Sequence, residues 1–183
     1  MITCEALLRA KNLASMLGVG PVEFHGIGLL AAEGIGRVAA ARRLGLRERL
    51  ARRVLHALRK SPELSNFYRE LRKVVAEVRG LSCTPVLYGN ISSELLEKAR
   101  TRLISLRDYI VIYARDPGKV EVIGFSSEDK LEYPGLPEDL AGLYAEARAT
   151  LPRIKGLVIC WRSYKSYLDD ALVLSALTEL CTR

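Results

Sequence analysis

Hydrophobic positions in the first 80 residues recur three and four residues apart, which is the spacing of amphipathic helices. This pattern predicts helices over residues 1–17, 22–34, 37–44, 47–60 and 63–80. Helix breakers separate them: "GVGP" at 18–21, Gly45, and "SP" at 61–62. The last helix is expected to carry one apolar stripe from Leu64 to Val78 and to end at Gly80. Residues 1–80 are therefore expected to form an all-helical N-terminal domain.

From residue 81 onward, helical and strand-like patterns alternate. "LSCTPVLYGN" at 81–90 is expected to contain the linker and the first strand of a second domain. Further strands are expected at 109–114, 120–125 and 156–161, with helices at 93–106, 138–151 and 166–180. In "YIVIYARDPGKVEVIGF", β-branched residues flank a Pro-Gly turn, which predicts a β-hairpin. Residues 81–183 are thus expected to be an α+β domain with a mainly antiparallel sheet.

The expected helix from Arg47 to Lys60 has an apolar side and a cationic side. At about 100° per residue, the apolar side comprises Leu50, Ala51, Val54, Leu55 and Leu58. The cationic side comprises Arg49, Arg52, Arg53, His56 and Lys60. A short helix and a tight turn at Gly45 precede it, which is the layout of a helix-turn-helix. In that motif the second helix enters the major groove of DNA, so this helix is the expected recognition helix.

The position of the positive charge supports a polyanionic partner. The chain has a net charge of +7, with 15 Lys and Arg against 7 Asp and Glu in residues 1–80, and 13 against 14 in residues 81–183. An excess confined to one half is expected if only that half meets a polyanion. The alternative is the charged surface of a thermostable protein, since 20 of the 28 basic residues are Arg and Gln is absent.

Arginine can donate two hydrogen bonds to guanine and can equally bind phosphate. By position on the helix, we expect Arg49, Arg52, Arg53 and His56 to face the groove. We expect Arg37, Arg42, Arg43, Arg47 and Lys60 to contact the DNA backbone. These residues form the candidate DNA-binding site.

The segment "GIGRVAAARRLGLRERLARRVLHAL" resembles the helix-turn-helix of a small archaeal family of predicted transcriptional regulators whose function is largely unknown. The matching positions are Gly36, Arg37, Leu44, Leu46, Arg52, Leu55 and Leu58. "LPEDLAGLYAEARATLPRIKGLVICWRSYKSYLDDALVLSAL" is similar to the family's C-terminal segment, in which a strand ends in Trp, here Trp161. The resemblance spans about residues 21–181. It implies a winged-helix-like N-terminal domain and a C-terminal GAD-like α+β domain that senses a ligand or dimerises.

The chain departs from the family pattern at two places. Arg49 and Leu50 stand where the family has Gly and a hydroxyl residue, so the recognition helix lacks its usual cap. The segment after Leu58 offers no hairpin signal, so the wing is expected to be short or lost. The stripe from Leu64 to Val78 is then left for packing between domains or subunits.

A second candidate site lies in "WRSYKSY" at 161–167, where a strand meets a helix. Arg162, Ser163, Tyr164 and Lys165 could bind an anionic ligand there. The alternative, which we favour, is helix capping by Ser163 together with aromatic packing.

Other chemistry is not indicated by the sequence. Four widely separated cysteines lack metal-ligand spacing and are expected to be buried small apolar side chains. We expect no catalytic residues, metal, cofactor, signal peptide or membrane span, and therefore a cytoplasmic protein.

The leading prediction is a non-enzymatic, homodimeric transcriptional regulator that binds double-stranded DNA, with or without a small-molecule effector. One alternative is a ligand-binding or enzymatic C-terminal domain, with the basic helices acting as an RNA or protein adaptor. A third is an interaction module in which the cationic stripe is buried against acidic residues such as Glu63, Glu70 or Glu77.

Overall fold

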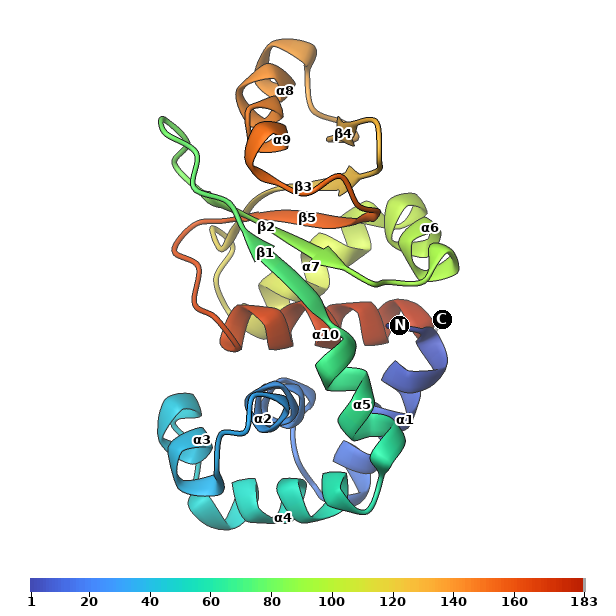
Figure 1. Ribbon diagram of the computed structural model, residues 1–183, viewed down its shortest axis with the longest axis vertical. Coiled ribbons are helices and arrows are strands. Elements are labelled where there is room, and N and C mark those ends of the chain that lie inside the picture. Colours follow the sequence, from blue (N-terminus) through green and yellow to red (C-terminus); the bar gives the residue numbers. More distant parts are fainter. Residues whose placement is uncertain (183) are drawn as a thin grey trace. The chain divides into compact units, whose positions relative to one another are not determined.

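The computed structural model describes residues 1–182, which divide into two compact units (Figure 1). The helical unit comprises residues 2–70 and the segment from Lys165 onward, and the sheet unit comprises Met1 and residues 71–164. The α+β class and the antiparallel sheet are confirmed. The units differ from the expected domains 1–80 and 81–183, because residues 71–80 join the sheet and the last helix joins the N-terminal helices.

The helical unit is organised around two helices that are buried on nearly all sides. It contains α1 (Cys4–Met16), α2 (Pro21–Ala32), α3 (Arg37–Leu44), α4 (Glu48–Arg59), α5 (Pro62–Glu70) and α10 (Leu168–Cys181). Helix α2 packs against each of the others in this unit, and the buried residues of α10 run from Asp169 to Leu180 with one interruption. An all-round apolar helix is stable only inside a core.

Among residues 1–182 no single helix is long and apolar enough to cross a bilayer. Helices α1 and α2 reach that length and hydropathy only when taken together, and they are bent by 112° relative to each other.

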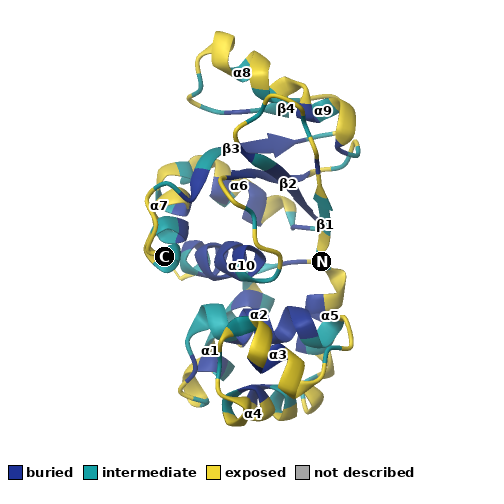
Figure 2. Cartoon of the chain, turned by 90° about the vertical axis from the view of Figure 1, so that its left-hand side faces the viewer, coloured by how far each residue is buried: buried dark blue, intermediate teal, exposed yellow. Residues whose placement is uncertain are grey.

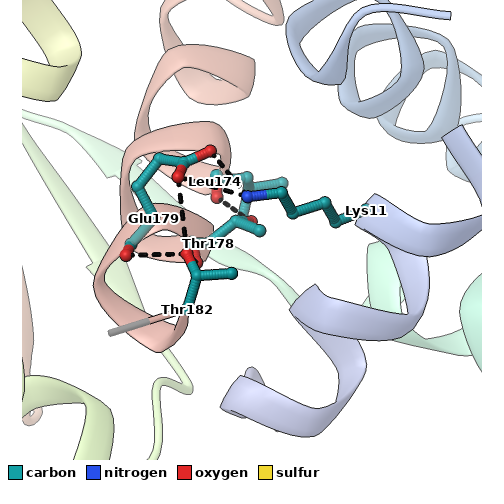
Figure 3. Close-up of polar contacts among 5 residues, drawn as sticks. All are labelled: Lys11, Leu174, Thr178, Glu179 and Thr182. Carbon is teal, nitrogen blue, oxygen red and sulfur yellow. Dashed lines mark hydrogen bonds and ion pairs between the residues drawn. The ribbon is translucent and has the colours of Figure 1, made fainter. Parts of the chain in front are cut away.

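The C-terminal end of the last helix, α10, is attached to α1. Cys4 and Cys181 form a disulfide between the two helices. The Lys11 ammonium of α1 also lies 3.0 Å from Glu179 Oε1 of α10, and the Thr182 hydroxyl donates to the backbone carbonyl of Glu179 (Figure 3). These contacts explain why α10, although distant in sequence, belongs to the N-terminal helices.

The sheet unit is a five-stranded antiparallel sheet with helices on both faces. Its strands are β1 (Arg72–Val75), β2 (Thr84–Gly89), β3 (Val120–Ser126), β4 (Leu131–Glu132) and β5 (Gly156–Trp161), in the order β1-β2-β5-β3-β4. The central strand β5 is buried throughout. Helices α6 (Ser93–Thr101) and α7 (Leu103–Ala114) lie on one face, and α8 (Glu138–Ala145) and α9 (Ala147–Thr150) lie on the other (Figure 1).

The helix expected over residues 63–80 is wrong in its second half. Helix α5 ends at Glu70, and Arg72–Val75 form an edge strand that pairs with β2, with Val74 opposite Leu87. Val74, Ala76 and Val78 pack against one apolar cluster of the sheet unit, a spacing of two residues. The three- and four-residue steps noted in the sequence fitted a helix equally well, and pairing with β2 decided between them. The stripe expected from Leu64 to Val78 therefore does not exist as one surface.

The strand expected at 109–114 is also wrong, and with it the first half of the expected hairpin. These residues continue α7, in which Leu106 and Ile110 are buried four residues apart while Ile112 is exposed. A short apolar run has no clear period, so the run could not be assigned from its residues alone. The second half of the expected hairpin is confirmed as β3, which pairs with β4 and β5.

The expectation of unbonded cysteines is wrong. Cys83 and Cys160 form a second disulfide, in the sheet unit. Cys160 lies in β5, opposite Pro85 of β2. The bridged residues are separated by 177 and 77 positions in the chain, so no local spacing of cysteines indicates these pairings.

Candidate nucleic-acid interface

Helices α3 and α4 form a compact pair joined by a tight turn, as expected. Helix α3 ends at Gly45, which adopts the left-handed conformation with φ of +65°, and the amide of Leu46 donates to the carbonyl of Ala41 at 2.8 Å. Arg47 then precedes the first residue of α4. Ala40 and Ala41 are buried in α3, and their small side chains let α4 approach closely.

Helix α4 has the two faces that its sequence predicts. Ala51, Val54 and Leu58 are buried, whereas Leu50 and Leu55 are only half-buried. Exposed basic residues cover the opposite side: Arg49, Arg52, Arg53, His56 and Lys60. Figure 2 shows exposed residues along the outer sides of both α3 and α4. The four basic residues expected to contact the DNA backbone from α3 and the turn, Arg37, Arg42, Arg43 and Arg47, are exposed as well.

Three of these basic residues have interactions within the protein. Arg37 pairs with Glu48 at 2.8 Å, which links the starts of α3 and α4. The Arg53 guanidinium donates to the carbonyl of Leu17 at the end of α1. Arg43 lies near Tyr167 and opposes the rise in the Tyr167 pKa that its hydrogen bond to Glu33 causes.

The other basic residues of the site have no partner among residues 1–182. They are Arg42, Arg47, Arg49, Arg52, His56 and Lys60. In the interaction-module alternative Glu63 was one residue that could cover the stripe, but Glu63 pairs with Arg9 instead. An exposed surface on which six basic residues lack a counter-charge within the described chain is suited to an external polyanion.

The start of α4 is stabilised without the hydroxyl cap that the sequence lacks. Arg47 precedes the helix and provides no side-chain cap. Instead Glu48 in the first turn places a negative charge at the positive end of the helix dipole, and Arg37 holds it there. The helix start left uncertain by Arg49 and Leu50 is therefore at Glu48.

Two basic residues of the same region escaped the sequence analysis. Arg59 and Arg69 line a cleft together with Arg37, Arg52 and His56. Arg52, His56 and Arg59 are spaced at i, i+4 and i+7, which places them along one side of α4. This spacing could have identified Arg59 from the sequence. Arg69 reaches the same cleft only through the packing of α5.

A buried polar pair lies beside this cleft. His25 Nδ1 in α2 lies 3.0 Å from the Tyr68 hydroxyl in α5, and both side chains are buried. Burial lowers the pKa of His25 to about 3, so its imidazole is neutral at physiological pH. Burial also raises the pKa of Tyr68. His25 is therefore a structural partner of Tyr68 and not a surface cation.

Several backbone polar groups of the second candidate site are hydrogen-bonded within the protein. Arg162 donates its amide to the carbonyl of Lys119, and the Lys119 ammonium binds the carbonyl of Ser163 at 2.9 Å. Tyr164 packs its ring 6.5 Å from that of Trp161. Arg162, Ser163 and Tyr164 are the last residues of the sheet unit, whereas Lys165 belongs to the helical unit.

The capping that we expected from Ser163 comes from two buried carboxylates instead. Asp169 accepts from the amide of Lys165 at 2.6 Å, and Asp170 accepts from the amide of Tyr167 at 2.9 Å. Both lie in the first turn of α10, where negative charge is favourable. Asp169 and Asp170 thus close the turn that enters the last helix.

The described part of the chain contains no ready metal-binding cluster. Within residues 1–182 no three His, Cys, Asp or Glu side chains come together as metal ligands could. Basic side chains make up the candidate site, and such groups suit anions. Comparison with known proteins finds no matching family model, curated protein or solved structure.

Proposed function

We propose that this protein binds double-stranded DNA and regulates transcription, with α3 and α4 as a helix-turn-helix and α4 as its recognition helix. The observation that carries the proposal is the exposed face of α4, where Arg49, Arg52, His56 and Lys60 have no partner among residues 1–182. The buried opposite face holds the helix rigidly for docking. The major groove of B-DNA admits such a helix, and arginine can read guanine there.

For six of the nine basic residues, the roles follow from their surroundings. Arg49 and Lys60 are free to contact DNA directly, and Arg42 and Arg47 are free to contact the flanking phosphates. Arg53 donates one hydrogen bond to Leu17 and Arg37 is paired with Glu48, so both contribute less to DNA binding than the unpaired residues do. The proposal assigns no wing, because α5 follows α4 directly, and it assigns no covalent chemistry. It includes the homodimer, which matches paired half-sites in DNA.

The test is duplex-DNA binding measured by fluorescence anisotropy across a salt series. We expect Arg49→Ala/Lys60→Ala to weaken binding at least tenfold. If both residues contact phosphate, the slope of log K against log salt becomes shallower by about 1.8. The matched control is Arg79→Ala/Arg153→Ala, which removes the same charge from exposed residues of the sheet unit. Sedimentation of the complex reports whether two chains bind one duplex.

Two outcomes would contradict the proposal. One is a wild-type protein that binds no duplex even at low salt. The other is an equal effect of the test and control variants, which would mean that only net charge matters. An RNA duplex of the same sequence provides a further comparison, because the narrow major groove of A-form RNA excludes a helix. Equal or tighter binding to RNA would favour the adaptor alternative.

A further inference from the structure

The helical unit contains a cleft of about 520 Å³ lined by α2, α4, α5 and the start of α3. Small-molecule sites in proteins fall within about 300–1,000 Å³. Five basic residues contribute to the lining, namely Arg37, Arg52, His56, Arg59 and Arg69, and the lining includes no acidic residue. The cleft therefore has both the size and the charge of a site for a small anion.

Four of these basic side chains have no partner within the described part of the protein. Arg52, His56, Arg59 and Arg69 have no ion pair or hydrogen bond among residues 1–182, and Arg37 alone is paired, with Glu48. Several cationic groups around one hollow repel one another, and a bound anion relieves that repulsion. Guanidinium groups bind phosphate by paired hydrogen bonds, which favours phosphate over a carboxylate of lower charge.

The rest of the lining is mostly apolar, with Ser65 as its polar residue. Tyr68 is buried, its hydroxyl is held by His25, and its ring lies against Gly28, where any side chain would collide with it. Ala31, Ile35 and Leu55 complete this part of the lining. A site that combines cations with an apolar floor suits a ligand with a phosphate group on an organic body.

We propose that this cleft binds a phosphorylated small molecule. Arg59 and Arg69, with Arg52, hold the phosphate, and the organic part of the ligand packs toward Tyr68 and Leu55. The concave shape and the buried aromatic floor favour a small ligand over the backbone of a DNA duplex, whose outer surface is convex. The binding step does not depend on the DNA-binding proposal, although three lining residues, Arg37, Arg52 and His56, belong to both surfaces.

The experiment titrates the full chain, without DNA, with inorganic phosphate and with phenyl phosphate in a calorimeter at constant ionic strength. Wild type is expected to bind one phenyl phosphate per chain, at least fivefold more tightly than inorganic phosphate. Arg59→Ala/Arg69→Ala is expected to weaken binding at least tenfold, and Arg79→Ala/Arg153→Ala to leave it unchanged. Circular dichroism and thermal unfolding establish that each variant is folded.

Three results would overturn the proposal. The first is the absence of saturable binding of either probe by wild type. The second is binding that Arg59→Ala/Arg69→Ala leaves intact, since the anion then lies elsewhere. The third is an absence of probe binding together with a selective loss of duplex affinity in that variant, which would make the cleft part of the DNA interface. The first two results do not depend on whether Arg49 and Lys60 bind DNA.

Discussion

Arg49 and Arg53 lie one helical turn apart on α4 and look equivalent in the sequence. Arg53 donates to the carbonyl of Leu17, whereas Arg49 has no partner among residues 1–182. The same contrast separates the two histidines, because His25 is buried against Tyr68 and His56 is exposed beside the cleft. Residue type therefore predicted which groups could bind an anion, and only the neighbours of each side chain decided which groups are free to do so.

The burial of His25 makes stability depend on pH. Its pKa is about 3 in the folded protein and about 6.5 when unfolded, so the unfolded state alone takes up this proton between those values. We expect the free energy of unfolding to fall as pH decreases from about 6.5 toward 3, by up to about 1.4 kcal/mol per pH unit from this residue. Above pH 6.5 the contribution is constant. Urea denaturation of wild type and His25→Gln at several pH values measures it.

The variant isolates His25 from the carboxylates that titrate in the same range. Gln keeps a side chain that can hydrogen-bond to the Tyr68 hydroxyl but has no proton to take up. Its stability should therefore decline less steeply than that of wild type below pH 6.5. Parallel declines in the two proteins would show that His25 is not protonated on unfolding in this range.

At the scale of elements, the hydrophobic pattern predicted an element correctly where the residues of that segment determine its structure. The helices at 37–44 and 47–60 appear as α3 and α4 within one residue of the expected bounds, because their apolar residues face one side and a glycine ends the first of them. Residues 72–75 and 109–114 were assigned wrongly. Val74 continued the helical spacing that starts at Leu64, and 109–114 is a short apolar run that fits either a helix or a strand. Pairing with β2 decided the first, and continuation of α7 decided the second.

Helix α2 shows why a poor helix former can be required inside a helix. A Cβ at Gly28 would lie 2.4 Å from ring atoms of Tyr68, so Gly28→Ala must displace that ring and loosen the packing of α2 against α5. We expect a loss of about 1–3 kcal/mol in the free energy of unfolding, despite the higher helix propensity of Ala. Denaturant unfolding followed by circular dichroism measures the change.

A matched control is available in α8. Gly142 has open space around its Cβ position, so Gly142→Ala should stabilise the sheet unit by up to about 1 kcal/mol. If both substitutions changed stability in the same direction and by the same amount, helix propensity alone would account for them, and the close approach of Tyr68 would be irrelevant.

At the scale of the whole molecule, disulfides join segments that are far apart in the chain. One joins α1 to α10, and the other lies within the sheet unit. A cross-link restricts the unfolded chain, and the chain-entropy model gives each bridge a maximum of about 4–5 kcal/mol. We expect Cys4→Ala/Cys181→Ala to unfold at a lower guanidinium concentration than wild type, and reductant to have the same effect on wild type.

The two bridges can be separated by their variants. Cys83→Ala/Cys160→Ala should lower the stability of the sheet unit and leave the helical unit with its own disulfide. A wild-type unfolding midpoint that does not change with reductant would contradict a stabilising role for either bridge.

The two proposed sites share residues, and this predicts that they compete. Arg52 and His56 line the cleft and also lie on the exposed face of α4. If both proposals hold, saturating phenyl phosphate at constant ionic strength should weaken duplex binding about fivefold or more, and duplex should weaken phenyl phosphate binding by the same factor. Fluorescence anisotropy with and without the ligand measures this coupling.

The cleft variant supplies the control for this coupling. Arg59→Ala/Arg69→Ala should bind duplex without responding to phenyl phosphate, because its cleft no longer holds the ligand. A response that persists in this variant would assign the effect to direct competition of the ligand with DNA phosphates on α4.

The sequence alone determined the features that depend on neighbours within a few residues. These are the N-terminal helices, the turn at Gly45, the two faces of α4 and the concentration of positive charge in one half of the chain. Helical periodicity and turn chemistry are local, so a single segment carries enough information to predict them.

Tertiary structure alone decided the features that depend on segments far apart in the chain. The edge strand β1 exists through its pairing with β2, α10 joins the first helices through its contacts with α1 and α2, and the disulfides close over long loops. The cleft arises in the same way, because α5 brings Arg69 and Tyr68 beside Arg52 and Arg59 of α4. The free energy of such contacts depends on which surfaces meet, and no local pattern of residues records that.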